Sequence, residues 1–182
     1  MVVTMLISNS HLSIHALRME DKDILVKWMS NPTVLQYYQG RDEPLDMEKV
    51  TEIFYDPDTE DVQSIIEYEG VPIGYIQYYL LDEESRQAYG YQDADEIIYG
   101  MDQFIGEPEY WNRGIGTLLI QTMITFLTQQ KQAHRIAMDP QTWNTRALHC
   151  YEKCGFQKVK LLQKHEWHEG QYRDCWLIEY KR

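Results

Sequence analysis

The order of helical and extended patterns along the chain predicts a mixed α+β domain. Apolar residues first recur at helical spacing, two β-rich runs then flank a turn signal, and strand and helix patterns alternate toward the C-terminus. Helices followed by an antiparallel meander and by strand–helix units are typical of this class. The chain has 182 residues, 43 % of them hydrophobic, and shows no linker, repeat or low-complexity segment. One domain spanning 1–182 is therefore expected.

The N-terminal part is interpreted as one strand followed by helices. Residues 13–17 predict a strand. Residues 20–29 predict a helix, because acidic residues occupy its first turn and an Asn-Pro pair stops it. Two further helical pieces are expected, one around Val34 and Tyr38 and one near 44–55.

The middle of the chain changes to the period of strands. Residues 62–81 predict a hairpin with its turn at Glu69-Gly70. Residues 82–95, crowded with Tyr, Asp and Gly, predict a loop. A third strand is expected over 95–105, in which Gly100 indicates a bulge or a close approach by another backbone segment.

The C-terminal part alternates helices and strands. Helical spacing returns after Gly116, and 134–140 predicts a short buried strand. Residues 144–156 predict a helix that an Asn caps and a Gly follows. Two last strands are expected near 156–163 and 174–181, around a polar loop.

The charge balance narrows the class of partner. Asp and Glu number 29 against 17 Lys and Arg, which gives a net charge of −12. Nucleic-acid binding depends on neutralising phosphates with Lys and Arg, so this balance argues against it. An acidic protein suits a small cationic partner, although the charge also keeps a protein soluble without further function.

The N-terminus and the cysteines predict a cytoplasmic protein. The first ten residues lack a basic segment and a long apolar run, and no stretch is long enough for a membrane span. Cys150, Cys154 and Cys175 are an odd number and are interpreted as reduced thiols, the first two packing on a helix. His165 and His168 lie three apart, which does not fit the H-E-x-x-H zinc motif, so no metal is expected.

The stretch "EYWNRGIGTLLIQ" (109–121) predicts an anion site. Gly114 and Gly116 lie where a helix begins, and a helix N-terminus offers unpaired N–H groups and about half a positive charge. Glycines let a phosphate come close to those groups, and Arg113 can add a charge-assisted contact. Such a glycine pair is also common in plain turns, and it matches neither a Walker loop nor a dinucleotide fingerprint.

The surroundings of this loop resemble the GNAT superfamily of acetyl-CoA-dependent N-acetyltransferases. "WNRGIG" follows a strand and begins a helix, and "DPQTWNTRALHCYEKCGF" (139–156) matches the later strand–Asn–helix–Tyr unit. The resemblance implies a mixed, mostly antiparallel twisted sheet with helices on both faces, and acetyl-CoA as co-substrate. It places Asn144 on the pantetheine arm and Tyr151 near the thioether sulfur. The other implied cofactor contacts are Gln103, Phe104, Ile105, Arg113, Gly114, Ile115, Gly116 and Thr117.

A narrower resemblance points to the aminoglycoside 6′-N-acetyltransferases. It depends on "VPIGYIQYY", "YGMDQFIGEPEYW" and "HEGQYRDCWLIEY" and extends from about Ile14 to Tyr180. The chain is most similar to the acetyltransferase half of the bifunctional acetyltransferase–phosphotransferases. The resemblance implies acetylation of the 6′-amine of polycationic antibiotics such as kanamycin or tobramycin, by direct attack in a ternary complex, and hence resistance. The alternatives are an acetyltransferase for a protein N-terminus or polyamine, and a non-catalytic module that binds CoA or cations.

The chemistry of amine acetylation assigns roles to several side chains. An aliphatic amine is mostly protonated at neutral pH, so a base must remove a proton, and the resemblance places Asp102 in that role. Backbone N–H groups from Gln103 to Ile105 would hold the oxyanion, and Tyr151 would protonate the thiolate. Without the resemblance, Asp102 is a solvated strand-end carboxylate and Tyr151 a packing aromatic.

Four further side chains are expected to contact a cationic acceptor. In a regular strand, Glu96 would share one face with Asp102. Asp139 ends a strand before a proline, a position that also suits a turn residue. Tyr38 would stack on a sugar ring or pack in the core, and Glu169 would close the pocket or lie at an exposed hairpin tip. The oligomeric state stays open.

Overall fold

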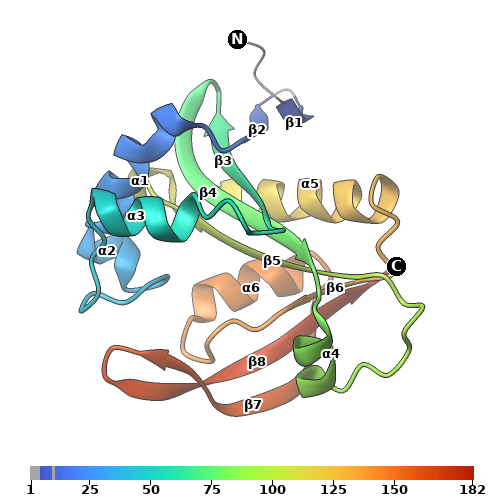
Figure 1. Cartoon of the computed structure of the whole chain (residues 1–182). Coiled ribbons are helices and arrows are strands. Elements are labelled where there is room, and N and C mark those ends of the chain that lie inside the picture. Colours follow the sequence, from blue (N-terminus) through green and yellow to red (C-terminus); the bar gives the residue numbers. More distant parts are fainter. Residues whose placement is uncertain (1–4, 10) are drawn as a thin grey trace. The chain divides into compact units, whose positions relative to one another are not determined.

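The computed structural model describes residues 5–9 and 11–182 and has the predicted α+β class (Figure 1). Within these residues the strands form one eight-stranded sheet in the order β1-β2-β3-β4-β5-β6-β8-β7. The strands are β1 (Met5–Ser8), β2 (Leu12–Ala16), β3 (Val62–Tyr68), β4 (Val71–Leu80), β5 (Ile98–Ile105), β6 (Arg135–Met138), β7 (Gln157–His168) and β8 (Gln171–Lys181). The helices are α1 (Lys22–Met29), α2 (Pro32–Leu35), α3 (Met47–Phe54), α4 (Glu83–Tyr89), α5 (Ile115–Gln129) and α6 (Thr145–Lys153), with 3₁₀ turns at Met19–Asp21 and Pro108–Tyr110.

The chain forms two compact units that interleave in the sequence. The first contains the chain up to Gln77 together with Gln103–Arg113, and the second contains Tyr78–Asp102 and Gly114–Arg182. Strands β4 and β5 therefore contribute residues to both units. The single domain expected from the sequence stays a prediction.

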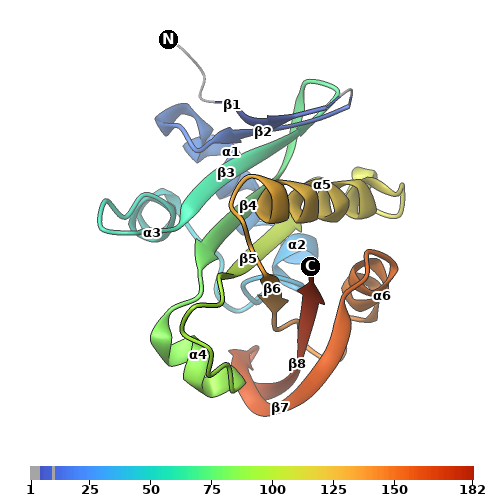
Figure 2. The same ribbon diagram turned by 90° about the vertical axis from the view of Figure 1, so that its right-hand side faces the viewer.

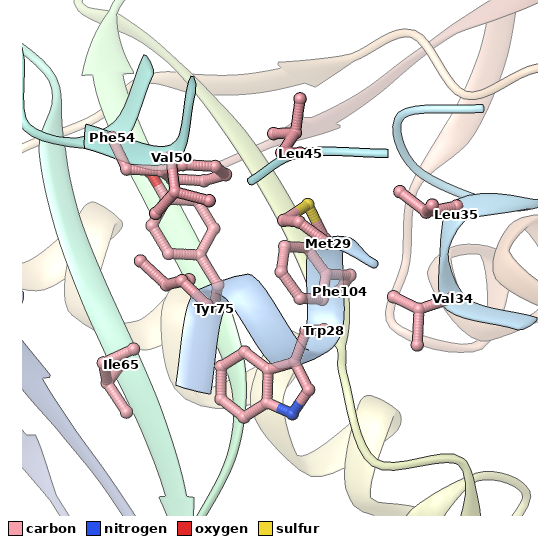
Figure 3. Close-up of a cluster of buried hydrophobic side chains, with 11 residues drawn as sticks. Trp28, Met29, Val34, Leu35, Leu45, Val50, Phe54, Ile65, Tyr75 and Phe104 are labelled. Atoms are coloured by element: carbon pink, nitrogen blue, oxygen red, sulfur yellow. The ribbon is translucent and has the colours of Figure 1, made fainter. Parts of the chain in front are cut away.

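The core of the first unit lies between α1, α2 and α3 and the inner face of the sheet (Figure 3). Leu25, Trp28 and Met29 recur at helical spacing and are completely buried. The Trp28 ring meets Phe104 edge-on, with the ring centroids 5.9 Å apart. Side-chain caps set the helix starts, since Asp46 accepts a hydrogen bond from the Lys49 N–H at 3.0 Å. Local capping and the apolar stripe thus account for these predicted helices.

The first hairpin turns where the sequence predicts. Glu69 and Gly70 have φ values of 50° and 79°, the left-handed conformations of a two-residue type I′ turn. The turn joins β3 to β4, and β3 pairs antiparallel with β2 on its other side. Strand β1, which pairs with β2, was not predicted from the sequence.

In the second unit, different segments of the chain pack on the two faces of β8 (Figure 2). Successive residues of a strand point to opposite faces. The Glu179 carboxylate accepts a hydrogen bond from the Tyr91 hydroxyl, whereas the ring of Tyr180 packs on Phe156, which follows α6. The segment that includes α4 and the helix α6 therefore cover opposite faces of β8. The sheet is mixed here, because β6 pairs parallel with β5 and antiparallel with β8.

The predicted loop over 82–95 is wrong in its first half, where α4 forms. The Asp82 carboxylate accepts a hydrogen bond from the Ser85 N–H at 2.7 Å, and Gly90 ends the helix with a φ of 86°. The segment therefore has both an N-cap and a left-handed C-terminal glycine, the usual boundary signals of a helix.

The predicted polar loop between the last two strands is also wrong. Strand β7 continues to His168 and β8 starts at Gln171, so only Glu169 and Gly170 form the turn. Their φ values are 48° and 80°, again those of a type I′ turn. Polar residues are tolerated because β7 is an edge strand with mostly exposed side chains.

No helix in residues 5–9 and 11–182 combines the length and apolarity that a membrane span requires.

Candidate functional site

The glycine loop of the second unit leaves the start of α5 open. Gly114 precedes the helix with a φ of 79° and a ψ of −1°, and the described residues provide no side-chain cap there. A methyl group on Gly114 would meet no neighbour, so the backbone conformation, not space, favours glycine. The N–H groups of Ile115, Gly116 and Thr117 lie in the first turn, where no intrahelical partner exists. This turn has the hydrogen-bond donors that the diphosphate of coenzyme A requires.

Helix α6 packs its cysteines against this first turn. The Thr117 hydroxyl lies 3.7 Å from the Cys150 sulfur, and the Cys154 thiol lies 3.7 Å from the Thr117 carbonyl oxygen. Burial raises the pKa of Cys154 to about 11, so the thiol stays protonated at neutral pH. In the described part of the chain, no three His, Cys, Asp or Glu side chains are grouped as a metal site.

The two α6 residues assigned to the cofactor lie at opposite ends of this helix. The Asn144 side-chain oxygen caps the helix by accepting a hydrogen bond from the Ala147 N–H at 3.3 Å. Its NH₂ group keeps the capacity to donate to a ligand. The half-buried ring of Tyr151 packs on Phe156, with centroids 6.1 Å apart. The roles of both residues stay predictions.

Two acidic residues lie just beyond the paired part of the parallel strands β5 and β6. The register joins Gly100 of β5 to Ala137 of β6. Asp102, within β5, and Asp139, directly after β6, each lie two residues beyond that pair, so alternation directs both side chains to one face. Two carboxylates on one face of neighbouring chain segments make an anionic site for an amine.

Two partly buried tyrosines donate hydrogen bonds to these carboxylates. Burial raises the pKa of Tyr79 well above its ordinary value, and the charges of Asp102 and Asp139 and a hydrogen bond to Asp102 raise it further. Burial likewise raises the pKa of Tyr89, whose hydroxyl donates to the Asp139 Oδ2 atom at 2.9 Å. Both phenols therefore remain protonated donors that hold the carboxylates in place.

Gly100 leaves room for the ring of Tyr79. A methyl group on Gly100 would overlap the Cε2, Cζ and hydroxyl atoms of that ring. The sequence indicates a bulge or a close backbone approach at Gly100, and the group that approaches it is instead a side-chain ring. The burial along β5 also departs from strict alternation there, because Gly100 and Met101 are both buried.

We expect Gly100→Ala to destabilise the protein by about 1–3 kcal/mol, because overpacking displaces the Tyr79 ring. The same displacement should lower kcat through the loss of the hydrogen bond to Asp102. Urea unfolding and steady-state kinetics measure the two effects. Gly116→Ala is the stability control, since its methyl group would lie at an ordinary 3.6 Å from the Cys150 sulfur. Equal unfolding midpoints for Gly100→Ala and the wild type would contradict the expectation.

A His–Glu pair on β7 extends the acidic site. His165 Nε2 lies 2.7 Å from Asp139 Oδ2. Although burial opposes ionisation, hydrogen bonds from His165 and Tyr89 hold the pKa of Asp139 below its ordinary value. Glu166 is next to His165, and burial raises its pKa. No sequence motif indicates Glu166. His165 was considered only as a zinc ligand and was set aside because its spacing from His168 does not fit the zinc motif.

Glu166 is held from the strand end that carries Asp139. The Gln141 amide donates to Glu166 Oε1 at 3.0 Å. The indole N–H of Trp143 donates to the Gln141 side-chain oxygen, so both polar ends of this buried amide are used. Asp139 also acts electrostatically on Glu166, which links the two carboxyl groups.

Glu96 requires a correction. Strand β5 begins at Ile98, so Glu96 precedes it and does not extend the strand face of Asp102. Arg135 pairs with Glu96 at 2.9 Å and with Glu179 at 2.5 Å, and its guanidinium lies 4.5 Å from the centre of the Tyr91 ring. These groups line a cavity of about 430 Å³. Glu96 therefore shares Arg135 with Glu179, and its contact with a cationic acceptor stays a prediction.

Comparison with known families identifies the class of protein. A family model described as an acetyltransferase (GNAT) domain matches residues 18–164. The chain belongs to the GNAT acetyltransferase family. The GNAT fold and the use of acetyl-CoA, both implied by the resemblance in the sequence, agree with this match.

Individual relatives of this GNAT chain include antibiotic-modifying enzymes. It is 26 % identical over 155 residues to the aminoglycoside N(6′)-acetyltransferase type 1 of Klebsiella pneumoniae, covering 83 % of this chain and 76 % of that protein. The aminoglycoside acetyltransferase AAC(6′)-Ib with coenzyme A and kanamycin has a similar structure, with a TM-score of 0.72, 23 % identity and coverage of 94 % and 95 %. The spermidine N-acetyltransferase from Vibrio cholerae, with CoA and spermine, has a TM-score of 0.75 at 20 % identity, covering 95 % and 96 %. The last two likenesses concern the fold alone.

The remaining sequence-predicted residues of the GNAT chain lie in the first unit or at a turn. Tyr38 packs on Phe104, with ring centroids 4.6 Å apart, in the core of the first unit. The Ile105 carbonyl accepts a hydrogen bond from the Trp111 indole at 2.8 Å, and Arg113 lies over the Tyr110 ring. Gln103 belongs to the same strand end. Glu169 lies in the β7–β8 turn.

Proposed function

We propose that this GNAT enzyme transfers the acetyl group of acetyl-CoA to the 6′-amine of aminoglycosides such as kanamycin or tobramycin. The observation that carries the proposal is the joint position of Asp102 and Asp139, each two residues beyond the last paired residues of the parallel strands and each with a tyrosine donor. A polycationic amine suits such a pair of carboxylates, and the net charge of −12 attracts it. The 26 % identical Klebsiella pneumoniae relative supports the same acceptor class.

In the proposed mechanism Asp102 is the base that removes a proton from the acceptor ammonium. The Tyr79 hydroxyl orients this carboxylate. Asp139 binds a second positive charge of the acceptor. When bound, acetyl-CoA supplies the activated thioester, and the first-turn amides after Gly114 hold its diphosphate. Tyr151 is the proton donor for the departing sulfur.

A polyamine is the second candidate acceptor. The same two carboxylates, with Glu166 beside them, would bind the ammonium groups of a linear polyamine without any contact to a sugar ring. The two candidates share the base and the cofactor site, and they differ only in the acceptor.

A panel of acceptors scored by release of free CoA thiol tests the proposal. Purified protein with acetyl-CoA should release thiol with kanamycin and tobramycin, and mass spectrometry should locate the acetyl group on the 6′-nitrogen. An aminoglycoside with a 6′-hydroxyl in place of the amine is the matched negative acceptor. Turnover with spermidine and none with the antibiotics would support the second candidate. No turnover with any aminoglycoside would refute the first.

A further inference from the structure

The Asp139 carboxylate already contacts a titratable side chain of the protein itself, the imidazole of His165. His165 Nε2 lies 2.7 Å from the Oδ2 atom of Asp139, and the Tyr89 hydroxyl donates to the same oxygen at 2.9 Å. About a third of each side chain of the ion pair is exposed, 31 % for His165 and 32 % for Asp139. A dissolved ligand can therefore reach the pair.

An irregularity in the backbone of β7 places His165 beside Asp139. The register of β7 with β8 is irregular between Leu162 and Glu166. Lys164 has a φ of 49°, and its N–H donates to the Asp174 carboxylate on β8 at 2.8 Å. A bulge of this kind redirects the next side chain, and it brings His165 to the end of β6.

The charges around His165 favour its protonated form. Asp139 contacts it from the end of β6, and Glu166 acts on it from β7 itself. The ring of Tyr89 packs on it from α4, with centroids 6.4 Å apart, and Asp102 of β5 acts on that tyrosine. Asp174 of β8 accepts a hydrogen bond from the backbone N–H of Lys164, the residue before His165.

We propose that His165 is a specificity-determining residue, whose imidazolium occupies at Asp139 the place that a substrate ammonium must take. The inference rests on the proposed function, because it assumes that Asp139 binds the acceptor. An acceptor with a single ammonium group replaces the His165–Asp139 ion pair by its own ion pair with Asp139 and gains no further contact. An acceptor with several ammonium groups also gains Asp102 and Glu166, so the site selects polycations over monoamines.

The sign of the pH dependence follows from the charge of His165. Its hydrogen bond to Asp139 raises the pKa of His165, burial opposes this, and Glu166 adds to it. Below that pKa the imidazolium competes with a cationic ligand. As the pH rises through it, the ring becomes neutral and Asp139 is offered to the ligand. Acceptor affinity in the wild type should therefore rise as the pH passes through the raised pKa of His165, over a range in which aliphatic amines remain charged.

His165→Asn removes the charge and keeps a side-chain donor for Asp139. Calorimetry without acetyl-CoA should show that this variant binds kanamycin and spermidine about 3–10-fold more tightly than the wild type near pH 6. The difference should shrink as the pH rises through the raised pKa of His165, because the wild-type imidazole then loses its charge. His11→Asn is the matched control, since it removes a His–Glu pair of 3.2 Å in the first unit, and it should bind as the wild type does.

An NMR titration of the wild-type His165 ring tests the same displacement without a variant. Saturating kanamycin or spermidine should lower the pKa of His165, because binding and protonation are reciprocally linked. An unchanged pKa, or equal affinities of His165→Asn and the wild type at every pH, would overturn the inference.

The outcomes separate this inference from the proposed function. Displacement of His165 by these cations without transfer to any aminoglycoside would support the inference and refute the proposed function. Acetylation of the 6′-amine with no dependence of binding on His165 would refute the inference alone. Failure of both cations to bind would overturn both, since nothing would then displace the imidazolium.

Discussion

Asp102→Asn should lower kcat for acetyl transfer by about 10²–10⁴-fold, the usual contribution of a general base. The asparagine oxygen can still accept the hydrogen bond that Tyr79 donates to Asp102, so the shape of the site is kept while its basicity is lost. Because the free amine forms in solution at high pH, part of the lost activity should return as the pH approaches the pKa of the acceptor.

Steady-state kinetics with calorimetry for coenzyme A measures this effect. The variant should bind coenzyme A as tightly as the wild type, because Asp102 takes no part in holding the diphosphate. Asp42→Asn is the control, since Asp42 is an exposed residue of the loop between α2 and α3, and it should keep wild-type kcat. An unchanged kcat for Asp102→Asn would remove Asp102 from the role of base.

Trp28→Ala should cost about 3–5 kcal/mol of the free energy of unfolding, the usual effect of removing a large buried aromatic side chain. Trp28 is completely buried in the core of the first unit (Figure 3). Its ring fills the space beside Gly106, where any side chain would collide with it. The indole N–H donates to Glu107 Oε1 at 2.9 Å, so the mutation also removes a hydrogen bond from a mostly buried carboxylate.

Urea unfolding followed by circular dichroism measures the loss. Trp167→Ala is the matched control, because Trp167 is 53 % exposed and contacts mainly the ring of Tyr172. That control should change the free energy of unfolding by at most about 1 kcal/mol. A Trp28→Ala midpoint equal to that of Trp167→Ala would show that the first unit does not depend on this core.

The acetyltransferase site was partly accessible from the sequence, and the accessible parts are local. The uncapped start of α5 could be predicted, because a glycine precedes an apolar stripe of helical spacing. In the structure this glycine, Gly114, has a left-handed conformation. Asn144 is the N-cap that its position predicts. Asp139 follows from its position at a strand end before a proline, and the resemblance to the GNAT family added Asp102. Both lie two residues beyond the paired residues Gly100 and Ala137.

Long-range contacts account for the residues that the sequence analysis missed or misplaced. Glu96 was expected beside Asp102, but the strand starts later and Arg135 pairs with it from β6. Tyr79, Tyr89 and Glu166 carry no motif. Tyr79 joins the site because β4 neighbours β5, and Tyr89 joins it from the end of α4. Glu166 joins it because β7 continues where a loop was expected.

By itself, the sequence determined the α+β class, most element positions, the hairpin turn at Glu69-Gly70 and the glycine loop. These features depend on caps, turns and apolar spacing among neighbouring residues, and such preferences act within a few residues of chain. Only the tertiary structure decided which polar groups meet. The pairing of β5 with β6 placed Asp102 beside Asp139, and the irregular pairing of β7 with β8 brought His165 to the same carboxylate. Strand pairing joins residues far apart in sequence, and no local preference encodes its partners.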